Sequence, residues 1–232
     1  MNQIRVFISF ILLFLFFSCN KEKSFVIEGK VDNPVFEGEK VYLVSSDGPI
    51  TKDVDSTLIK NGHFYFKIPA DSQKVKIVRI APKFPHIVED LVVIPEPGTI
   101  KVNLSQTSYG GGTPLNNFMQ EWKAKKEKYD SIQWILYSEK RTKDLSELKL
   151  DSINECSKRV KRVFMNEVMN DIENNLYNGV GLILFKIYFY SFPVDFKNKV
   201  LSKNGDLYSR KDKQMERIVK TTKDELEDSN GR

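Results

Sequence analysis

The sequence has few of the residues that most often carry chemistry. Its 232 residues include two cysteines, Cys19 and Cys156, and two histidines, His63 and His86. A zinc site needs several converging ligands, and neither histidine lies near a cysteine. The chain also lacks a Cys-x-x-Cys pair, a His-Glu-x-x-His motif, a glycine-flanked serine and a dinucleotide fingerprint. We therefore predict no metal, no cofactor and no catalytic residues, and a non-enzyme is the favoured interpretation.

Concentrated positive charge is missing as well. The net charge is +5, and the densest basic run, Lys123 to Lys128, is interrupted by Glu127. Proteins that bind nucleic acids usually gather their basic residues on one face and interleave aromatic residues. The three glycines at 110–112 lack the Lys and Ser or Thr that complete a phosphate loop, so they indicate a flexible connection. We predict no nucleic-acid partner.

No apolar run is long enough to cross a bilayer. The longest at the N-terminus, Val6 to Phe17, has 12 residues after the basic Arg5. As a helix it would span about 18 Å, against about 30 Å for the hydrocarbon core. A short basic start, an apolar stretch and a small residue are typical of a secretory signal, which we predict at residues 1–18. The alternative is a signal anchor that is never cut.

The end of this signal resembles a bacterial lipobox. The residues are Phe16-Phe17-Ser18-Cys19, in which Ser18 is the small residue before the cysteine, while Phe16 and Phe17 differ from the usual residues. The resemblance implies that Cys19 is acylated and becomes the first residue, with residues 19–23 as a lipidated tether. We expect a protein anchored in the cell envelope, at the outer membrane of a Gram-negative bacterium.

Residues 24–112 show the two-residue periodicity of β-strands. Phe64, Phe66 and Ile68 alternate with polar residues directly after Asn61-Gly62, a strong hairpin signal. About seven such short runs are separated by Gly, Pro, Asn and Asp, which predicts an antiparallel β-sandwich. Phe64 and Phe66 are expected in its core.

Asp53 and Asp55 are two residues apart, so both should lie on one side of a strand. They could bind a cation or act as paired carboxylates, but a solvated pair at a strand edge is the more common arrangement.

The same region resembles domain-of-unknown-function family 4369, the N-terminal domain of envelope thiol:disulfide interchange lipoproteins. The matching segments are Phe25-Val26-Ile27-Glu28-Gly29, Glu39-Lys40-Val41-Tyr42-Leu43, Asp55-Ser56, Asn61-Gly62-His63-Phe64-Tyr65-Phe66 and Gly112-Thr113-Pro114-Leu115-Asn116. The resemblance implies a small β-sandwich behind a lipidated N-terminus, followed by a helical segment. In the redox members a thioredoxin-like domain with Cys-x-x-Cys comes next. This chain has no such motif, so no redox residue can be carried over.

Residues 113–210 show helical periodicity. Thr113-Pro114 is a typical helix start, and two apolar stripes predict helices of about 25 residues each, which would pack on each other or on the sheet. A groove for a partner helix is the less frequent alternative. Cys156 lies on the second stripe and is expected to be a buried structural residue, with Lys158 and Arg159 pointing away from it.

Two segments remain near the C-terminus. Residues 180–192 are strongly apolar and predict a buried helix. Residues 211–232 are mostly charged and predict a surface helix or disordered tail.

The sequence therefore favours an α+β fold in a lipid-anchored envelope protein that acts as a non-catalytic binding or spacer module. Its expected partners are the membrane, through the lipid on Cys19, and a thioredoxin-like or other envelope protein. One alternative is a truncated thiol:disulfide interchange protein that has lost its thioredoxin-like domain. Another alternative is a glycan-binding sandwich. The excess of Phe (16) over Tyr (9) and Trp (2) argues against it.

Overall fold

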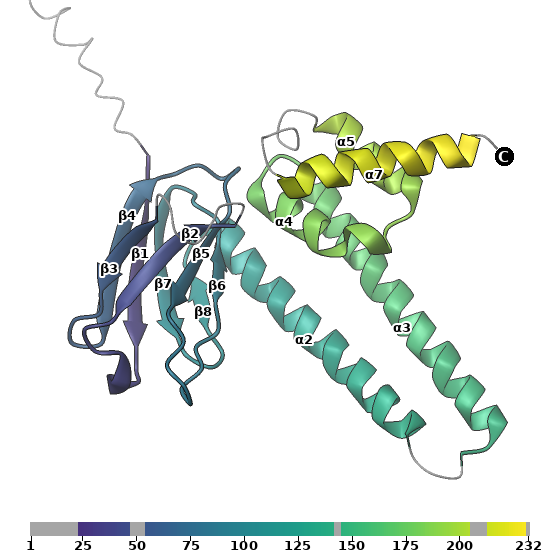
Figure 1. The fold of residues 1–232 in the computed structure, drawn as a ribbon, viewed down its shortest axis with the longest axis horizontal. Coiled ribbons are helices and arrows are strands. Elements are labelled where there is room, and N and C mark those ends of the chain that lie inside the picture. The colour runs from purple at the N-terminus through teal and green to yellow at the C-terminus, as the bar shows by residue number, and fades with distance from the viewer. Residues whose placement is uncertain (1–22, 47–53, 142–144, 205–212, 231–232) are drawn as a thin grey trace, which may run out of the picture.

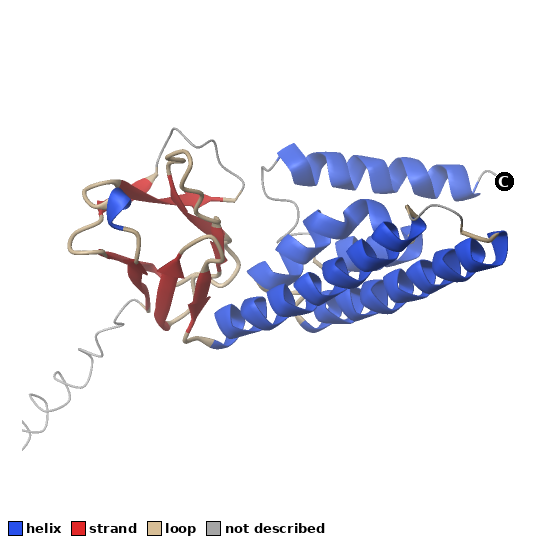
Figure 2. Ribbon diagram, turned by 90° about the horizontal axis from the view of Figure 1, so that it is seen from below, coloured by secondary structure: helices blue, strands red, loops and turns tan. Residues whose placement is uncertain are grey.

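A computed structural model describes residues 23–46, 54–141, 145–204 and 213–230 as a β-sandwich followed by helices (Figure 1). The signal peptide, Cys19 and Asp53 lie outside these residues. Within the described part, no helix is both long and apolar enough to cross a membrane. The α+β class is confirmed, with the strands and the helices in separate parts of the chain (Figure 2).

The sandwich consists of two four-stranded sheets. Sheet A has the order β4-β1-β7-β8, formed by His63–Pro69, Ser24–Val31, Gly98–Leu104 and Tyr109–Gly111. Sheet B has the order β3-β2-β5-β6, formed by Asp55–Leu58, Lys40–Ser45, Lys76–Ile80 and Leu91–Val93. A short 3₁₀ helix, η1, spans Pro34–Phe36.

Two details of the sheets differ from the sequence prediction. First, β1 and β7 pair in parallel, whereas the other five pairs are antiparallel. All of sheet B lies between β1 and β7 in the chain, and this long crossover lets both strands enter sheet A in the same direction. Second, Gly110 and Gly111 belong to an eighth strand, β8, rather than to a flexible connection. A Cβ atom on Gly110 would lie 2.7 Å from the Leu91 side chain, so the strand packs closely against the core.

The predicted helices are present. The two long ones are α2 (Pro114–Lys140, 27 residues) and α3 (Glu147–Asn174, 28 residues), which form a hairpin. They are followed by α4 (Gly179–Tyr188), η2 (Phe189–Ser191), α5 (Val194–Lys203) and α7 (Lys213–Asn230). In α4, Val180, Leu184 and Phe185 are fully buried, which confirms the predicted buried helix. Met215 and Ile218 of α7 also lie in the helical core, although they fall in the segment expected to be a charged tail.

A buried polar contact joins the two halves. The Asn116 side chain accepts a hydrogen bond from the Ile94 N–H (3.0 Å) and donates one to the Ile94 carbonyl (2.8 Å). Glu96, 8% exposed, accepts a hydrogen bond from the Leu115 N–H (2.6 Å), in the first turn of α2. The Thr113 side chain makes no capping bond, so Glu96 satisfies the free amides of the helix start in its place. The helical core also includes Val75 and Ile94 from the sandwich.

Candidate functional site

The outer face of sheet A carries two rows of side chains that run across the strands. Residues of β1 alternate between buried positions such as Ile27 and exposed positions such as Glu28 and Lys30. Strand register then fixes the neighbours of the exposed positions. The first row is His63, Lys30, Asn103 and Tyr109, and the second is Tyr65, Glu28 and Lys101, which ends at Gly111.

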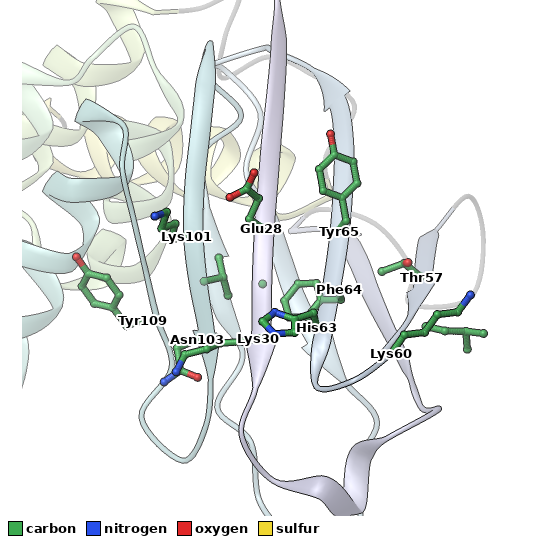
Figure 3. Close-up of a pocket in the computed structure, with 13 residues that line it drawn as sticks. Glu28, Lys30, Thr57, Lys60, His63, Phe64, Tyr65, Lys101, Asn103 and Tyr109 are labelled. Atoms are coloured by element: carbon green, nitrogen blue, oxygen red, sulfur yellow. The ribbon is translucent and has the colours of Figure 1, made fainter.

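These rows line a groove of about 840 Å³, here called the sheet A groove (Figure 3). Lys60 and Leu58, from β3 and the turn that follows it, form one side of its rim. The lining comes from β1, β3, β4, β7 and β8, so the groove extends over the width of the sheet. Because it lies on a face that the helices do not cover, it is open to solvent (Figure 1).

Two tyrosine rings mark the sides of the groove. Tyr65 on β4 is 52% exposed and Tyr109 on β8 is 54% exposed. These strands are three positions apart in the sheet, which corresponds to about 14 Å. A Cβ atom on Gly111 would lie 2.7 Å from the Tyr109 hydroxyl oxygen. The absence of a side chain at Gly111 therefore allows the Tyr109 ring to extend toward the second row, opposite Tyr65.

The polar groups between the rings differ in sign. The Lys30 ammonium lies 3.2 Å from Asp32, outside the groove. Lys60 and Lys101 form no ion pair with another described residue, although Lys101 lies beside Glu28 in the register. The Asn103 amide oxygen is buried and has no hydrogen-bond partner among the described residues. With three lysines against one glutamate, the lining is positive overall, and it offers both donors and acceptors.

A tight hairpin positions His63 and Lys60. Asn61 and Gly62 both have positive φ angles, 52° and 72°, as a two-residue hairpin turn requires. The Glu37 carboxylate accepts hydrogen bonds from the N–H groups of Asn61 (2.8 Å) and Gly62 (3.0 Å). These two bonds, Gly62 first, lower the pKa of Glu37, because they stabilise its charged form.

Beneath the groove, Phe64 fills the core side of β1. A Cβ atom on Gly29 would lie 1.9 Å from the Phe64 ring, so the ring occupies the space above this glycine. Phe64 and Phe66 are 5% and 6% exposed, which confirms the prediction that they are core residues. Phe64 touches the groove as part of its lining, although little of its ring is exposed, whereas Phe66 does not line the groove.

A second hollow, of about 810 Å³, lies on the outer face of sheet B. Its lining includes Tyr42, Arg79, the residues at 81–82 and the segment at 87–90. Arg79 and Asp90 form an ion pair there, and the hydrogen bond to Asp90 raises the pKa of the Arg79 guanidinium. Because this pair already satisfies the main charges of the second hollow, the sheet A groove is the better candidate site.

The candidates from the sequence do not meet in one place. Asp55 is exposed in β3 and does not line the sheet A groove, and the ring of His86 lies 3.2 Å from the Asn33 amide. Cys156 is only half-buried. The prediction that Arg159 points away from it is wrong, because its guanidinium lies 3.9 Å from the Cys156 sulfur. Residues i and i+3 share one face of a helix, which explains this contact.

The groove residues were missed by sequence reasoning, although a signal for them exists. Glu28, Lys30, Tyr65 and Lys101 are the solvent-facing members of alternating strands. Their alternation indicates the buried face of each strand, but the strand register that brings them together has no local signal in the sequence. Within the described residues, no group of three or more His, Cys, Asp or Glu residues could hold a metal ion.

The comparison with protein families gives one match. Residues 25–119 match the family described as Domain of unknown function (DUF4369), which confirms the resemblance to that family; the match covers the sandwich from the second residue of β1 and ends within α2. No curated protein and no solved structure matches the chain.

Proposed function

Residues 25–119 of this chain match the DUF4369 family, and from the groove that they form we propose that the chain is a non-catalytic binding module of the cell envelope. In this proposal a lipid on Cys19 holds the protein at the outer membrane, and the sheet A groove binds the ligand. The observation that carries the proposal is the open groove of about 840 Å³, lined by exposed tyrosines and by two lysines, Lys60 and Lys101, that have no ion pair within the described part of the chain.

The position of the groove supports a tethered binding role. Residues 19–23 would connect the lipid to Ser24, where β1 begins. The row that contains Lys30 lies six residues further along β1, which is about 20 Å from that end of the sheet. The groove would therefore be held away from the membrane surface, where a ligand has free access.

The chemistry of the lining supports binding rather than turnover. An activated nucleophile needs a hydrogen-bonded base, and among the described residues His63 has no side-chain partner of that kind. Tyrosine rings, lysines and an amide are typical of recognition surfaces, because they combine apolar area with hydrogen bonds.

Hydrogen exchange tests the binding role directly. The full chain, purified from membranes in detergent, is compared with and without a soluble extract of envelope polymers. We expect slower exchange confined to β1, β4, β7 and β8. A variant with Tyr65→Ala and Tyr109→Ala should lose this protection, whereas Tyr190→Ala, which changes an 81% exposed tyrosine of the helical half, should keep it. Protection elsewhere, or none, would reject the groove as the binding site.

Labelling with palmitate tests the anchor. The wild-type chain should incorporate the lipid and fractionate with the outer membrane, and globomycin should leave the precursor uncut. Cys19→Ala should abolish the label. A Cys19→Ala chain that is still processed and membrane-bound would contradict the anchor.

The proposal also includes an envelope protein as partner, thioredoxin-like or of another type, and the α2–α3 hairpin offers a place for it. Trp134, Ile135 and Leu148, near the end of the hairpin, are 67%, 60% and 84% exposed. Clustered exposed apolar residues are typical of protein contacts. A photocrosslinker at position 134 should capture one defined protein in cells, while the same group at position 190 should not. Equal capture at both positions would argue against this partner.

A further inference from the structure

We infer that the sheet A groove binds an acidic oligosaccharide, an inference that rests on the proposed binding function and names the class of its ligand. The juxtaposition that points to it is an ordered row across the sheet: Tyr65, Glu28, Lys101 and the hydroxyl end of Tyr109 above Gly111. Figure 3 shows Tyr65 and Tyr109 on opposite sides, with Glu28 and Lys101 between them.

The two rings suit the flat faces of sugar rings. Each tyrosine is about half exposed, so part of each ring is available to a ligand. A sugar ring presents a face of C–H groups that packs on an aromatic ring, and Tyr adds a hydroxyl group that forms hydrogen bonds. Since the strands that carry Tyr65 and Tyr109 are about 14 Å apart, the ligand must be extended and longer than a single sugar.

The polar groups between the rings suit a ligand with many hydroxyl groups. Sugar hydroxyls both donate and accept hydrogen bonds. Glu28 can only accept them, Lys101 can only donate them, and the Asn103 amide does both. The Asn103 amide oxygen has no partner among the described residues, and a buried acceptor without a partner is unfavourable. If the Asn103 side chain turned its oxygen toward the groove, a ligand hydroxyl would supply the missing donor.

The charge of the lining selects an acidic ligand. Lys60 and Lys101 have no ion pair with any described residue, and they outnumber Glu28, the one carboxylate among the described residues of the lining. A neutral sugar would leave both ammonium groups without a counter-charge. Carboxylate groups on the ligand would form charge-assisted hydrogen bonds with them, which are stronger than neutral ones. Binding should therefore weaken as salt is added.

Calorimetry with matched pairs of sugars tests the inference. The full chain in detergent is titrated with trimers of glucuronate, galacturonate and mannuronate, and with the methyl ester of each. An ester keeps the sugar rings but removes the charge. We expect at least one uronate trimer to bind, and its ester to bind about tenfold more weakly, as the loss of a charge-assisted hydrogen bond predicts.

Four variants locate the binding in the groove. Tyr65→Ala, Tyr109→Ala and Lys101→Gln should each weaken binding by about tenfold, because each removes a ring contact or a charged donor. Lys67→Gln is the matched control, since Lys67 is exposed on the same face of β4 but does not line the groove. It should leave the affinity unchanged. Circular dichroism confirms that each variant is folded.

Several outcomes would contradict the inference that the ligand is an acidic oligosaccharide. These are binding to none of the uronates, equal binding of the esters, or tighter binding of a thymidine hexanucleotide or of triglutamate. If such a result came together with protection of the groove by the envelope extract, the binding function would stand and only the ligand class would be wrong. If the extract also gave no protection, the proposed function itself would fail.

Discussion

Gly29 and Phe64 lie opposite each other in the β1–β4 pair, and substitution of the glycine should disturb the floor of the groove. The Cβ atom of an alanine at position 29 would lie 1.9 Å from the nearest Phe64 ring carbon and 2.2 and 2.3 Å from the next two. Carbon atoms pack at about 3.5–4.0 Å, so the ring would have to retreat by about 2 Å. The backbone of Gly29 does not have a positive φ angle, so steric overlap is the main cost.

The loss of stability caused by Gly29→Ala cannot exceed the packing energy that the Phe64 ring contributes. Overpacking of a core typically costs about 1–3 kcal/mol, and complete loss of a buried Phe side chain costs about 3–5 kcal/mol. We therefore expect Gly29→Ala to lower the free energy of unfolding by about 3 kcal/mol. With Phe64→Ala already in place, the overlap is absent, and the same substitution should cost close to nothing.

Urea denaturation of the four chains in this double-mutant cycle measures the coupling. The wild type, both single variants and the double variant are unfolded and followed by circular dichroism at a fixed temperature. The reasoning predicts a coupling of about 3 kcal/mol. If Gly29→Ala lowers the free energy of unfolding equally in both backgrounds, within about 0.5 kcal/mol, the contact does not explain the glycine.

Three further changes have defined outcomes. The Lys197 side chain is 4% exposed and pairs with Glu225 at 2.8 and 2.9 Å. Glu225→Gln should therefore lower the free energy of unfolding, measured in urea, by about 2 kcal/mol. Adding Lys197→Met to this variant should restore most of the lost stability. The folded-state pKa of Glu37 lies below its ordinary value of 4.5. The contribution of Glu37 to stability is therefore present above about pH 4.5 and is lost as the pH falls through the folded pKa. The difference in Tm between wild type and Glu37→Gln should shrink from pH 7 to pH 3, and a constant difference would contradict this. Burial raises the pKa of Tyr188, and its hydroxyl has no hydrogen-bond partner among the described residues. Tyr188→Phe removes this hydroxyl and should raise the free energy of unfolding by about 1 kcal/mol. A loss of stability would show that the hydroxyl does have a hydrogen-bond partner.

Much of the fold could be predicted from local pattern. The alternation around Phe64 and Phe66 identified a strand and its buried face, and Asn61-Gly62 identified the turn before it. The long helical stripes gave α2 and α3 nearly at their observed lengths. The glycines at 110 and 111 gave no strand signal, because β8 is short and is defined by its pairing with β7 rather than by its own side chains.

The candidate site could not be predicted in the same way. Tyr65, Glu28, Lys101 and Tyr109 come from four strands, and none of them belongs to a motif. Which of them become neighbours depends on strand order and on register, where a shift of one residue would send each side chain to the other face. The parallel pairing of β1 with β7 is part of that order and has no local signature.

By itself, the sequence determined most of the elements, their buried faces and the family that residues 25–119 match, because these follow from the spacing of apolar residues, from turn residues and from short ordered segments. The tertiary structure alone decided that an open, positively charged groove lies between two tyrosine rings, and that a glycine at position 111 leaves room for one of them. The physical reason is that such a groove is made of contacts between strands far apart in the chain, and their register is fixed only when the whole sandwich packs.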